Sequence, residues 1–162
     1  MKKFLLCLLG ILLVIVEMSI TNYIDIFNVS FNLLIIYITI ISLYLDETDV
    51  SIIGAIIGIV KDIAVGGIFG VNALTLFTIG YGISYLKNKI YKDSNITIFA
   101  LVFITSLFDS MINLVTVITV YNTYGLINLV TKGILIIPII NSVLSVLLYN
   151  LFKPSILKLK ED

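Results

Sequence analysis

Residues 54–70 read GAIIGIVKDIAVGGIFG, and a glycine or an aspartate recurs there at every fourth position. The recurring residues are Gly54, Gly58, Asp62, Gly66 and Gly70. Because residues four apart lie on one face of a helix, they form a stripe that is almost free of side chains and is interrupted by one carboxylate. In lipid, small residues allow two helix backbones to come into contact. The stripe therefore predicts a helix-packing face that is buried in protein.

The composition of the whole chain indicates a membrane protein. Hydrophobic residues make up 60% of its 162 residues and charged residues only 12%, whereas a typical soluble domain is about 25% charged. The mean hydropathy is +1.18. We expect an all-α integral membrane protein, with residues 1–162 forming a single transmembrane domain and no separate soluble domain.

Six stretches are candidate membrane spans, because a helix needs roughly 20 apolar residues to cross the hydrocarbon core. The third is interrupted by Lys61 and Asp62. The free-energy cost of inserting these two residues into the membrane is close to the free energy that its Ile and Val residues gain. Neighbouring helices must therefore hold this span in place. The predicted spans are residues 4–20, 26–45, 50–68, 71–86, 96–120 and 126–152.

The positions of the lysines predict the orientation of this bundle. Basic residues near the ends of spans stay on the cytoplasmic side, and six spans place eight of the ten on one side. We therefore expect both termini to face the cytoplasm of a bacterial cell, in a multi-pass protein of the plasma membrane. The eight are Lys2, Lys3, Lys87, Lys89, Lys92, Lys153, Lys158 and Lys160.

Four charged residues are expected in one layer in the outer half of the membrane. At a helical rise of about 1.5 Å per residue, Glu17 lies about 5 Å from its predicted outer end, and Asp62 and Lys132 about 9 Å from theirs. Lys61 lies at the level of Asp62 but points about 100° away, so each needs a different partner. The layer is either a site for a small molecule or ion, or a set of polar contacts that fixes the helix register; we favour the second interpretation.

A second polar focus lies at another depth, near the centre of the fifth predicted span. It consists of Asp109 and Asn113, with Ser106 and Ser110 beside them. Hydrogen bonding between helices is the interpretation that we favour for it.

The chain is poorly supplied for catalysis. It contains no His and a single Cys, Cys7, so it offers no His-dependent base, disulfide or zinc cluster. It also lacks a phosphate-binding Gly-Lys-Ser or Gly-Lys-Thr loop and a basic surface of the kind that binds nucleic acid. We expect neither an enzyme nor a cofactor.

The run from Gly54 to Asp62, continued by Gly66, Gly70, Val71 and Asn72 to Gly80 and Tyr81, resembles the central signature of MreD. MreD is the bacterial rod shape-determining membrane protein. The resemblance implies a noncatalytic scaffold of the cell-wall elongation complex that binds the membrane anchor of MreC. Its other implied partners are MreB filaments, RodA and a class B penicillin-binding transpeptidase.

The resemblance also implies a fold, because MreD is thought to be similar to the substrate-binding subunits of energy-coupling-factor vitamin transporters. Those subunits are bundles of six helices, as predicted here. They suggest an alternative function for this chain, a membrane subunit that binds a vitamin or another small solute.

Overall fold

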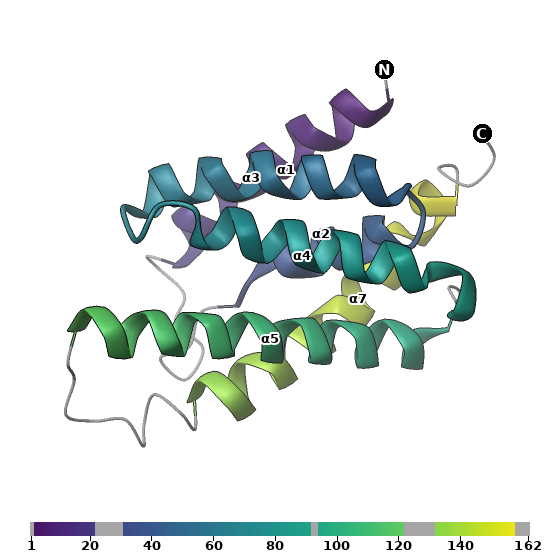
Figure 1. Ribbon diagram of the computed structural model, residues 1–162. Coiled ribbons are helices and arrows are strands. Elements are labelled where there is room, and N and C mark those ends of the chain that lie inside the picture. The colour runs from purple at the N-terminus through teal and green to yellow at the C-terminus, as the bar shows by residue number, and fades with distance from the viewer. Residues whose placement is uncertain (1, 22–30, 92–93, 122–131, 158–162) are drawn as a thin grey trace.

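A computed structural model describes residues 2–21, 31–91, 94–121 and 132–157 of the chain. All regular structure in these residues is helical. The principal helices (Figure 1) are α1 (Lys2–Thr21), α2 (Leu33–Ser42), α3 (Glu47–Val65), α4 (Val71–Leu86), α5 (Asn95–Tyr121) and α7 (Ile137–Leu157). Two short segments accompany them, the 3₁₀ turn η1 (Lys87–Lys89) and the π-helical turn η2 (Lys132–Ile136).

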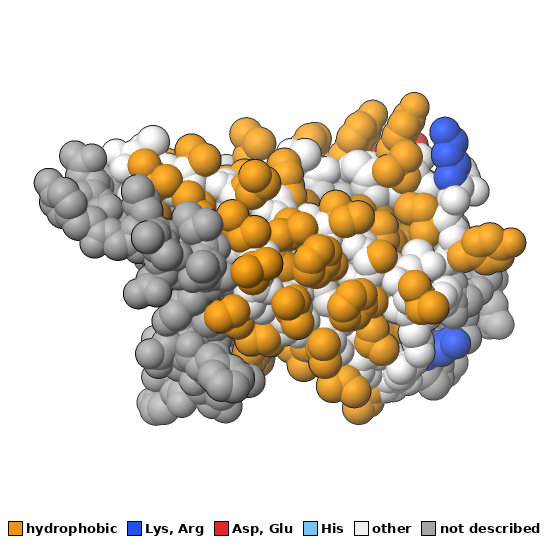
Figure 2. Space-filling view, turned by 90° about the horizontal axis from the view of Figure 1, so that it is seen from below, with side chains coloured by type: hydrophobic (Ala, Val, Ile, Leu, Met, Phe, Trp, Pro, Cys, Tyr) orange, Lys and Arg blue, Asp and Glu red, His pale blue; other side chains and the backbone are white. Residues whose placement is uncertain are grey.

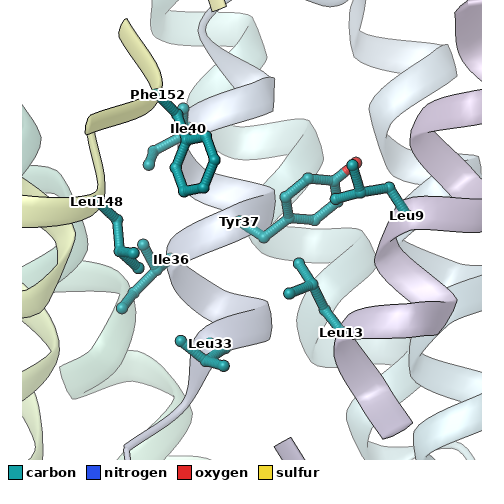
Figure 3. A pocket seen from close by; sticks show the side chains of 8 residues that line it. All are labelled: Leu9, Leu13, Leu33, Ile36, Tyr37, Ile40, Leu148 and Phe152. Carbon is teal, nitrogen blue, oxygen red and sulfur yellow. The ribbon is translucent and has the colours of Figure 1, made fainter. Parts of the chain in front are cut away.

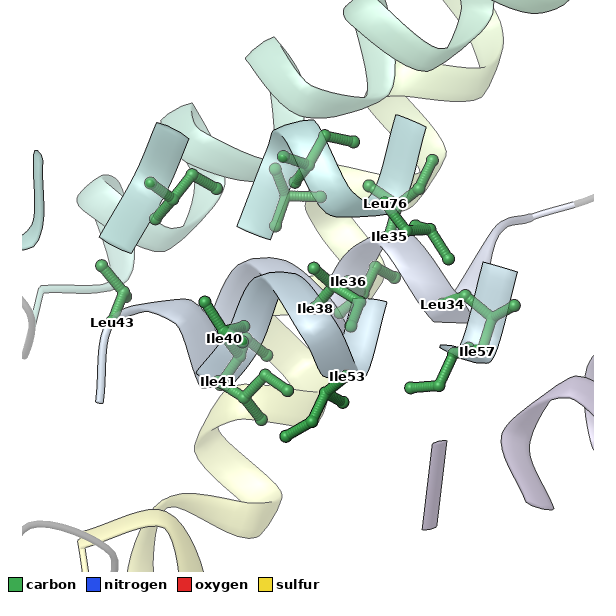
Figure 4. Close-up of a cluster of buried hydrophobic side chains, with 14 of the residues drawn as sticks. Leu34, Ile35, Ile36, Ile38, Ile40, Ile41, Leu43, Ile53, Ile57 and Leu76 are labelled. Atoms are coloured by element: carbon green, nitrogen blue, oxygen red, sulfur yellow. The ribbon is translucent and has the colours of Figure 1, made fainter. Parts of the chain in front are cut away.

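The helix α2 lies at the centre and contacts all five of the others. Eight of its ten residues are buried, as expected for a helix that is apolar on every side. Its buried Leu and Ile side chains form the middle of the core, together with Ile53 and Ile57 of α3 and Leu76 of α4 (Figure 4). At ten residues, α2 is about 15 Å long, shorter than the predicted span 26–45, of which residues 26–30 lie outside the described part.

Around α2, the helices pack mainly as two pairs, α3 with α4 and α5 with α7, while α1 packs on α3. The beginning of α1 and the end of α7 lie at the same end of the bundle (Figure 1). Two contacts support this arrangement. Lys3 of α1 pairs with Asp49 of α3, and the hydroxyls of Tyr44, just after α2, and Tyr149 of α7 are 3.3 Å apart.

Two of the described helices are long and apolar enough to cross a membrane, over residues Asn95–Thr119 and Ile134–Lys153. The helix α3 carries Glu47, Asp49, Lys61 and Asp62 within 19 residues, and α4 has only 16 residues. By length and composition, the described residues thus contain two candidate spans, and six spans remain a prediction.

Candidate functional site: the buried polar network

The carboxylate of Asp62 binds the beginning of α4. Its Oδ2 accepts hydrogen bonds from the backbone nitrogens of Gly70 (2.9 Å) and Ala73 (3.2 Å). Its Oδ1 accepts from the backbone nitrogen (3.1 Å) and the side-chain Nδ2 (2.8 Å) of Asn72. The first amides of a helix lack partners within the helix and carry its positive dipole end. Asp62, only 3% exposed, therefore caps α4 from the neighbouring helix.

Two glycines of the predicted stripe allow α3 and α4 to approach closely. A Cβ atom on Gly54 would lie 2.7 Å from the backbone oxygen of Leu76, and one on Gly58 only 2.3 Å from the Cα of Ala73. Both distances are too short for any side chain, so these positions require glycine. Gly54, Gly58 and Asp62 thus all face α4.

The other two glycines of the stripe do not belong to the packing face, and they form helix ends instead, which is the other role that their sequence predicts. A Cβ atom on Gly66 or Gly70 would meet no atom within 4 Å. Both have a positive φ, 70° at Gly66 and 95° at Gly70, a conformation that residues with a Cβ rarely adopt. Gly66 ends α3 and Gly70 precedes α4. Their function is to turn the chain, so that α4 begins beside Asp62.

Lys61 and Glu17 form an ion pair between α3 and α1. The Lys61 Nζ lies 2.9 Å from the Glu17 Oε1, and their side chains are 13% and 9% exposed. The other carboxylate oxygen of Glu17 accepts from the backbone nitrogen of Leu34, at 3.1 Å. Glu17 therefore satisfies an amide in the first turn of α2 as well as the lysine.

Asn32 connects this pair to Asp109, the centre of the second predicted polar focus. Its Oδ1 lies 3.4 Å from the Lys61 Nζ and caps α2 by accepting from the backbone nitrogen of Ile35. Its Nδ2 donates to the Asp109 Oδ2 at 3.3 Å. Asn113 donates to the same oxygen at 3.0 Å. The two predicted foci are thus one network. They lie at different depths along their helices, and the Asn32 side chain between them contacts both.

The network continues into α7 through Asn141, which is fully buried. Its Oδ1 accepts from the backbone nitrogen of Asn32 at 2.9 Å, and its Nδ2 donates to the Ser106 Oγ of α5 at 3.0 Å. Side chains of α1, α3, α5 and α7 therefore meet at the first turn of α2. Lys132, the fourth member of the predicted layer, begins η2, but its side chain lies outside the described part.

Sequence reasoning missed three asparagines of this site, Asn32, Asn72 and Asn141. Asn32 had a usable signal, because an asparagine directly before an apolar run is a preferred helix N-cap. The other two had only the general signal that polar residues in apolar segments form hydrogen bonds between helices.

Ion pairs at the opposite end of the bundle join the connecting segments. The Lys87 Nζ lies 3.0 Å from the Asp46 Oδ1, and this hydrogen bond holds the pKa of the Asp46 carboxyl below its ordinary value. The Lys3 Nζ lies 2.6 Å from the Asp49 Oδ2, and this hydrogen bond raises the pKa of Lys3. Both pairs lie toward solvent and tie neighbouring helices together at their ends.

Comparison with known proteins identifies the family of the chain. No curated protein and no solved structure matches it, so its likeness to the transporter subunits remains a prediction. The family model for the rod shape-determining protein MreD matches residues 1–156. That match extends far beyond the signature around Asp62 and includes every helix that contributes to the polar network. The chain therefore belongs to the MreD family of rod shape-determining membrane proteins.

Proposed function

We propose that this protein is a noncatalytic scaffold of the cell-wall elongation complex and that it binds the single membrane anchor of MreC. MreB filaments, RodA and a class B penicillin-binding transpeptidase are the further partners that we expect in the same assembly. The observation that carries the proposal is the family match over residues 1–156. The protein would act by holding partners together in the membrane.

The burial of the polar groups supports a scaffold. The described charged and amide side chains of the network, Lys132 thus not included, are hydrogen-bonded to one another and to helix ends, as shown by the contacts of Lys61, Asp62 and Asn32. Large apolar side chains face outward on α1, α4, α5 and α7. The face in Figure 2 is mostly apolar outside its grey part, and the charged side chains visible on it lie at one end. A surface of this kind suits contact with lipid and with apolar anchors of other proteins.

We further propose six spans with both termini in the cytoplasm. The short helix α2 and the charged helix α3 are poor spans alone, but within the bundle their polar groups have protein partners. Polar backbone and side chains are tolerated at membrane depth where protein surrounds them. The outward faces then meet lipid while α2 stays inside.

Topology is testable through single cysteines placed in a Cys7→Ser background, since Cys7 is the only native cysteine. An impermeant thiol reagent added to intact cells should leave Lys3→Cys and Lys89→Cys unlabelled and should label both after the cells are opened. Labelling of either position in intact cells would contradict the proposed orientation.

The scaffold is testable by depletion of the protein in its host. Depletion should round or swell the cells and delocalise MreC, and the full chain supplied in trans should restore both. In a second experiment, the detergent-solubilised protein should retain MreC but not an unrelated single-span protein of similar anchor length. Normal shape with correctly placed MreC, or a vitamin bound in place of MreC, would instead favour the transporter subunit.

A further inference from the structure

An apolar groove runs between α1 and α7, with α2 as its floor (Figure 3). Its volume is about 490 Å³, within the range of small-molecule sites. Leucines of α1 form one wall, and Leu148 and Phe152 of α7 form the other. The full lining is Leu9, Leu13, Leu33, Ile36, Tyr37, Ile40, Leu148 and Phe152.

The lining offers no polar group to an occupant. Seven of its eight side chains are hydrocarbon, and the eighth belongs to Tyr37. The Tyr37 hydroxyl already donates a hydrogen bond of 2.6 Å to the backbone oxygen of Leu6. Water needs polar partners in order to stay in a cavity. The groove therefore favours an apolar occupant.

The size and the lining both favour a flexible chain over a helix. Transmembrane helices dock closely on small residues, and the lining contains no Gly, Ala, Ser or Thr. A helix about 10 Å wide that crosses a 30 Å core occupies roughly 2,400 Å³, several times the volume of the groove. An acyl chain can bend around the Leu and Phe side chains and requires no flat surface.

A lysine directly follows a lining residue of the groove, and in the described part of the chain it has no carboxylate partner. Phe152 lines the groove, and the next residue, Lys153, places its Nζ 5.9 Å from the centre of the Tyr149 ring. By contrast, Lys3 and Lys87, near the same end of the bundle, are both paired with carboxylates. An ammonium at this end of the bundle attracts an anionic headgroup.

We propose that this groove is a binding site for an anionic phospholipid, with an acyl chain between α1 and α7 and the phosphate headgroup beside Lys153. The site is independent of MreC binding. The proposed orientation of the bundle serves only to assign the lipid to the cytoplasmic leaflet, so a failure of the topology experiment would change the leaflet and not the site.

The absence of tryptophan from the chain allows a direct test. Phe152→Trp places a single fluorophore in the groove, and Leu151→Trp places one at nearly the same depth on another side of α7, where Leu151 is 72% exposed. The full chain is reconstituted in vesicles of phosphatidylcholine and phosphatidylglycerol at a fixed ratio, and either lipid is brominated in its acyl chains. Bromine quenches tryptophan on contact, so quenching reports which lipid is adjacent.

Brominated phosphatidylglycerol should quench Phe152→Trp more effectively than brominated phosphatidylcholine at equal mole fraction. A single lysine near the headgroups should give a preference of about fivefold. The preference should disappear when Lys153→Gln is added. It should persist with Lys89→Gln, which removes an exposed lysine of η1 whose neighbours in the chain do not line the groove. Leu151→Trp should show no preference.

Equal quenching of Phe152→Trp by the two lipids would overturn the proposal, as would a preference that survives Lys153→Gln. Native mass spectrometry supplies a measurement that needs no tryptophan. The unmodified chain, mixed with equal amounts of the two lipids, should retain phosphatidylglycerol, and Lys153→Gln should retain the two equally. Equal retention by the unmodified chain would also overturn the proposal.

Discussion

The Asp62 carboxylate lies 2.9 Å from the backbone nitrogen of Gly70, eight residues further along the chain. This contact closes the turn between α3 and α4 and places an anion at the positive end of α4. It also explains how this carboxylate can stay buried although no lysine of the described residues pairs with it. Its four hydrogen-bond donors are backbone and side-chain amides of the helix that it caps.

Substitutions at Asp62 should distinguish the contribution of its acceptor oxygens to stability from that of its negative charge. Asp62→Asn keeps one oxygen acceptor, while its amide faces donors that it cannot satisfy. Asp62→Leu leaves all four donors unpaired, and each buried unpaired donor costs about 1–3 kcal/mol of stability. We expect Asp62→Leu to destabilise by more than about 4 kcal/mol and Asp62→Asn by roughly half of that. Thermal unfolding in detergent and abundance in membranes measure both.

A matched control is Asp46→Asn, because Asp46 precedes α3 without making a side-chain cap hydrogen bond. It should have little effect on either measurement. Equal loss, or equal tolerance, for Asp62→Asn and Asp62→Leu would contradict the capping function.

Gly58→Ala should force α3 and α4 apart, because the new methyl group would lie 2.3 Å from the Cα of Ala73. The backbone cannot move aside as a flexible side chain can. We therefore expect Gly58→Ala to destabilise the protein by about 3 kcal/mol, the upper end of the usual range for overpacking. Gly82→Ala on α4 is the control, since nothing lies within 4 Å of its Cβ position. It should be neutral or stabilise by up to about 1 kcal/mol through helix propensity. Similar unfolding temperatures for the two variants would contradict the close contact.

The bounds of a helix could be predicted from the sequence where residues next to its ends in the chain determine them. The helix α4 has the bounds 71–86 expected for the fourth span, because Gly70 precedes it and a lysine-rich turn follows it. The third helix begins and ends three residues earlier than expected. Its acidic residues Glu47 and Asp49 suit the positive end of a helix, and Gly66 adopts a left-handed conformation that ends it.

The site was less predictable, because its central residue depends on tertiary contacts. Counting depth along separate helices placed Lys61 and Glu17 at similar levels, and the structure shows them in contact. The same counting separated them from Asp109, since it could not show that Asn32 reaches both. The apolar groove had no sequence signal, because it arises from the way in which α1 and α7 flank α2.

The ion pair of Asp46 and Lys87 should make a small, pH-dependent contribution to stability. The pKa of the Asp46 carboxyl is lower in the folded protein than its ordinary value of 3.8. The stabilisation is therefore fully present above pH 3.8 and is lost as the pH falls through the lower folded-state pKa. Lys87→Gln should therefore narrow the stability difference between pH 5 and pH 3. An unchanged difference would show that other carboxylates account for the loss in acid.

The pair of Lys61 and Glu17 should behave as a coupled unit. Lys61→Met alone leaves a buried carboxylate, and Glu17→Gln alone leaves a buried ammonium, so each should cost about 3–5 kcal/mol. Glu17→Gln retains an oxygen for the amide of Leu34, so the double variant should recover most of the loss. Additive losses in a double-mutant cycle would refute the coupling.

Exchanging the amide of Asn32 and the carboxylate of Asp109 tests whether these two residues are energetically coupled. Asparagine and aspartate are equally good N-caps, so Asn32→Asp would be harmless at an isolated helix end. Here it places a second carboxylate where the Asn32 Nδ2 lies 3.3 Å from the Asp109 Oδ2. The Lys61 Nζ, 3.4 Å from the Asn32 Oδ1 and already paired with Glu17, offsets the new charge only in part, so we expect a loss of stability. Adding Asp109→Asn restores one amide and one carboxylate with their positions exchanged, and it should return most of the stability in thermal unfolding. If the double variant is no more stable than Asn32→Asp alone, Asn32 does not bridge the two foci.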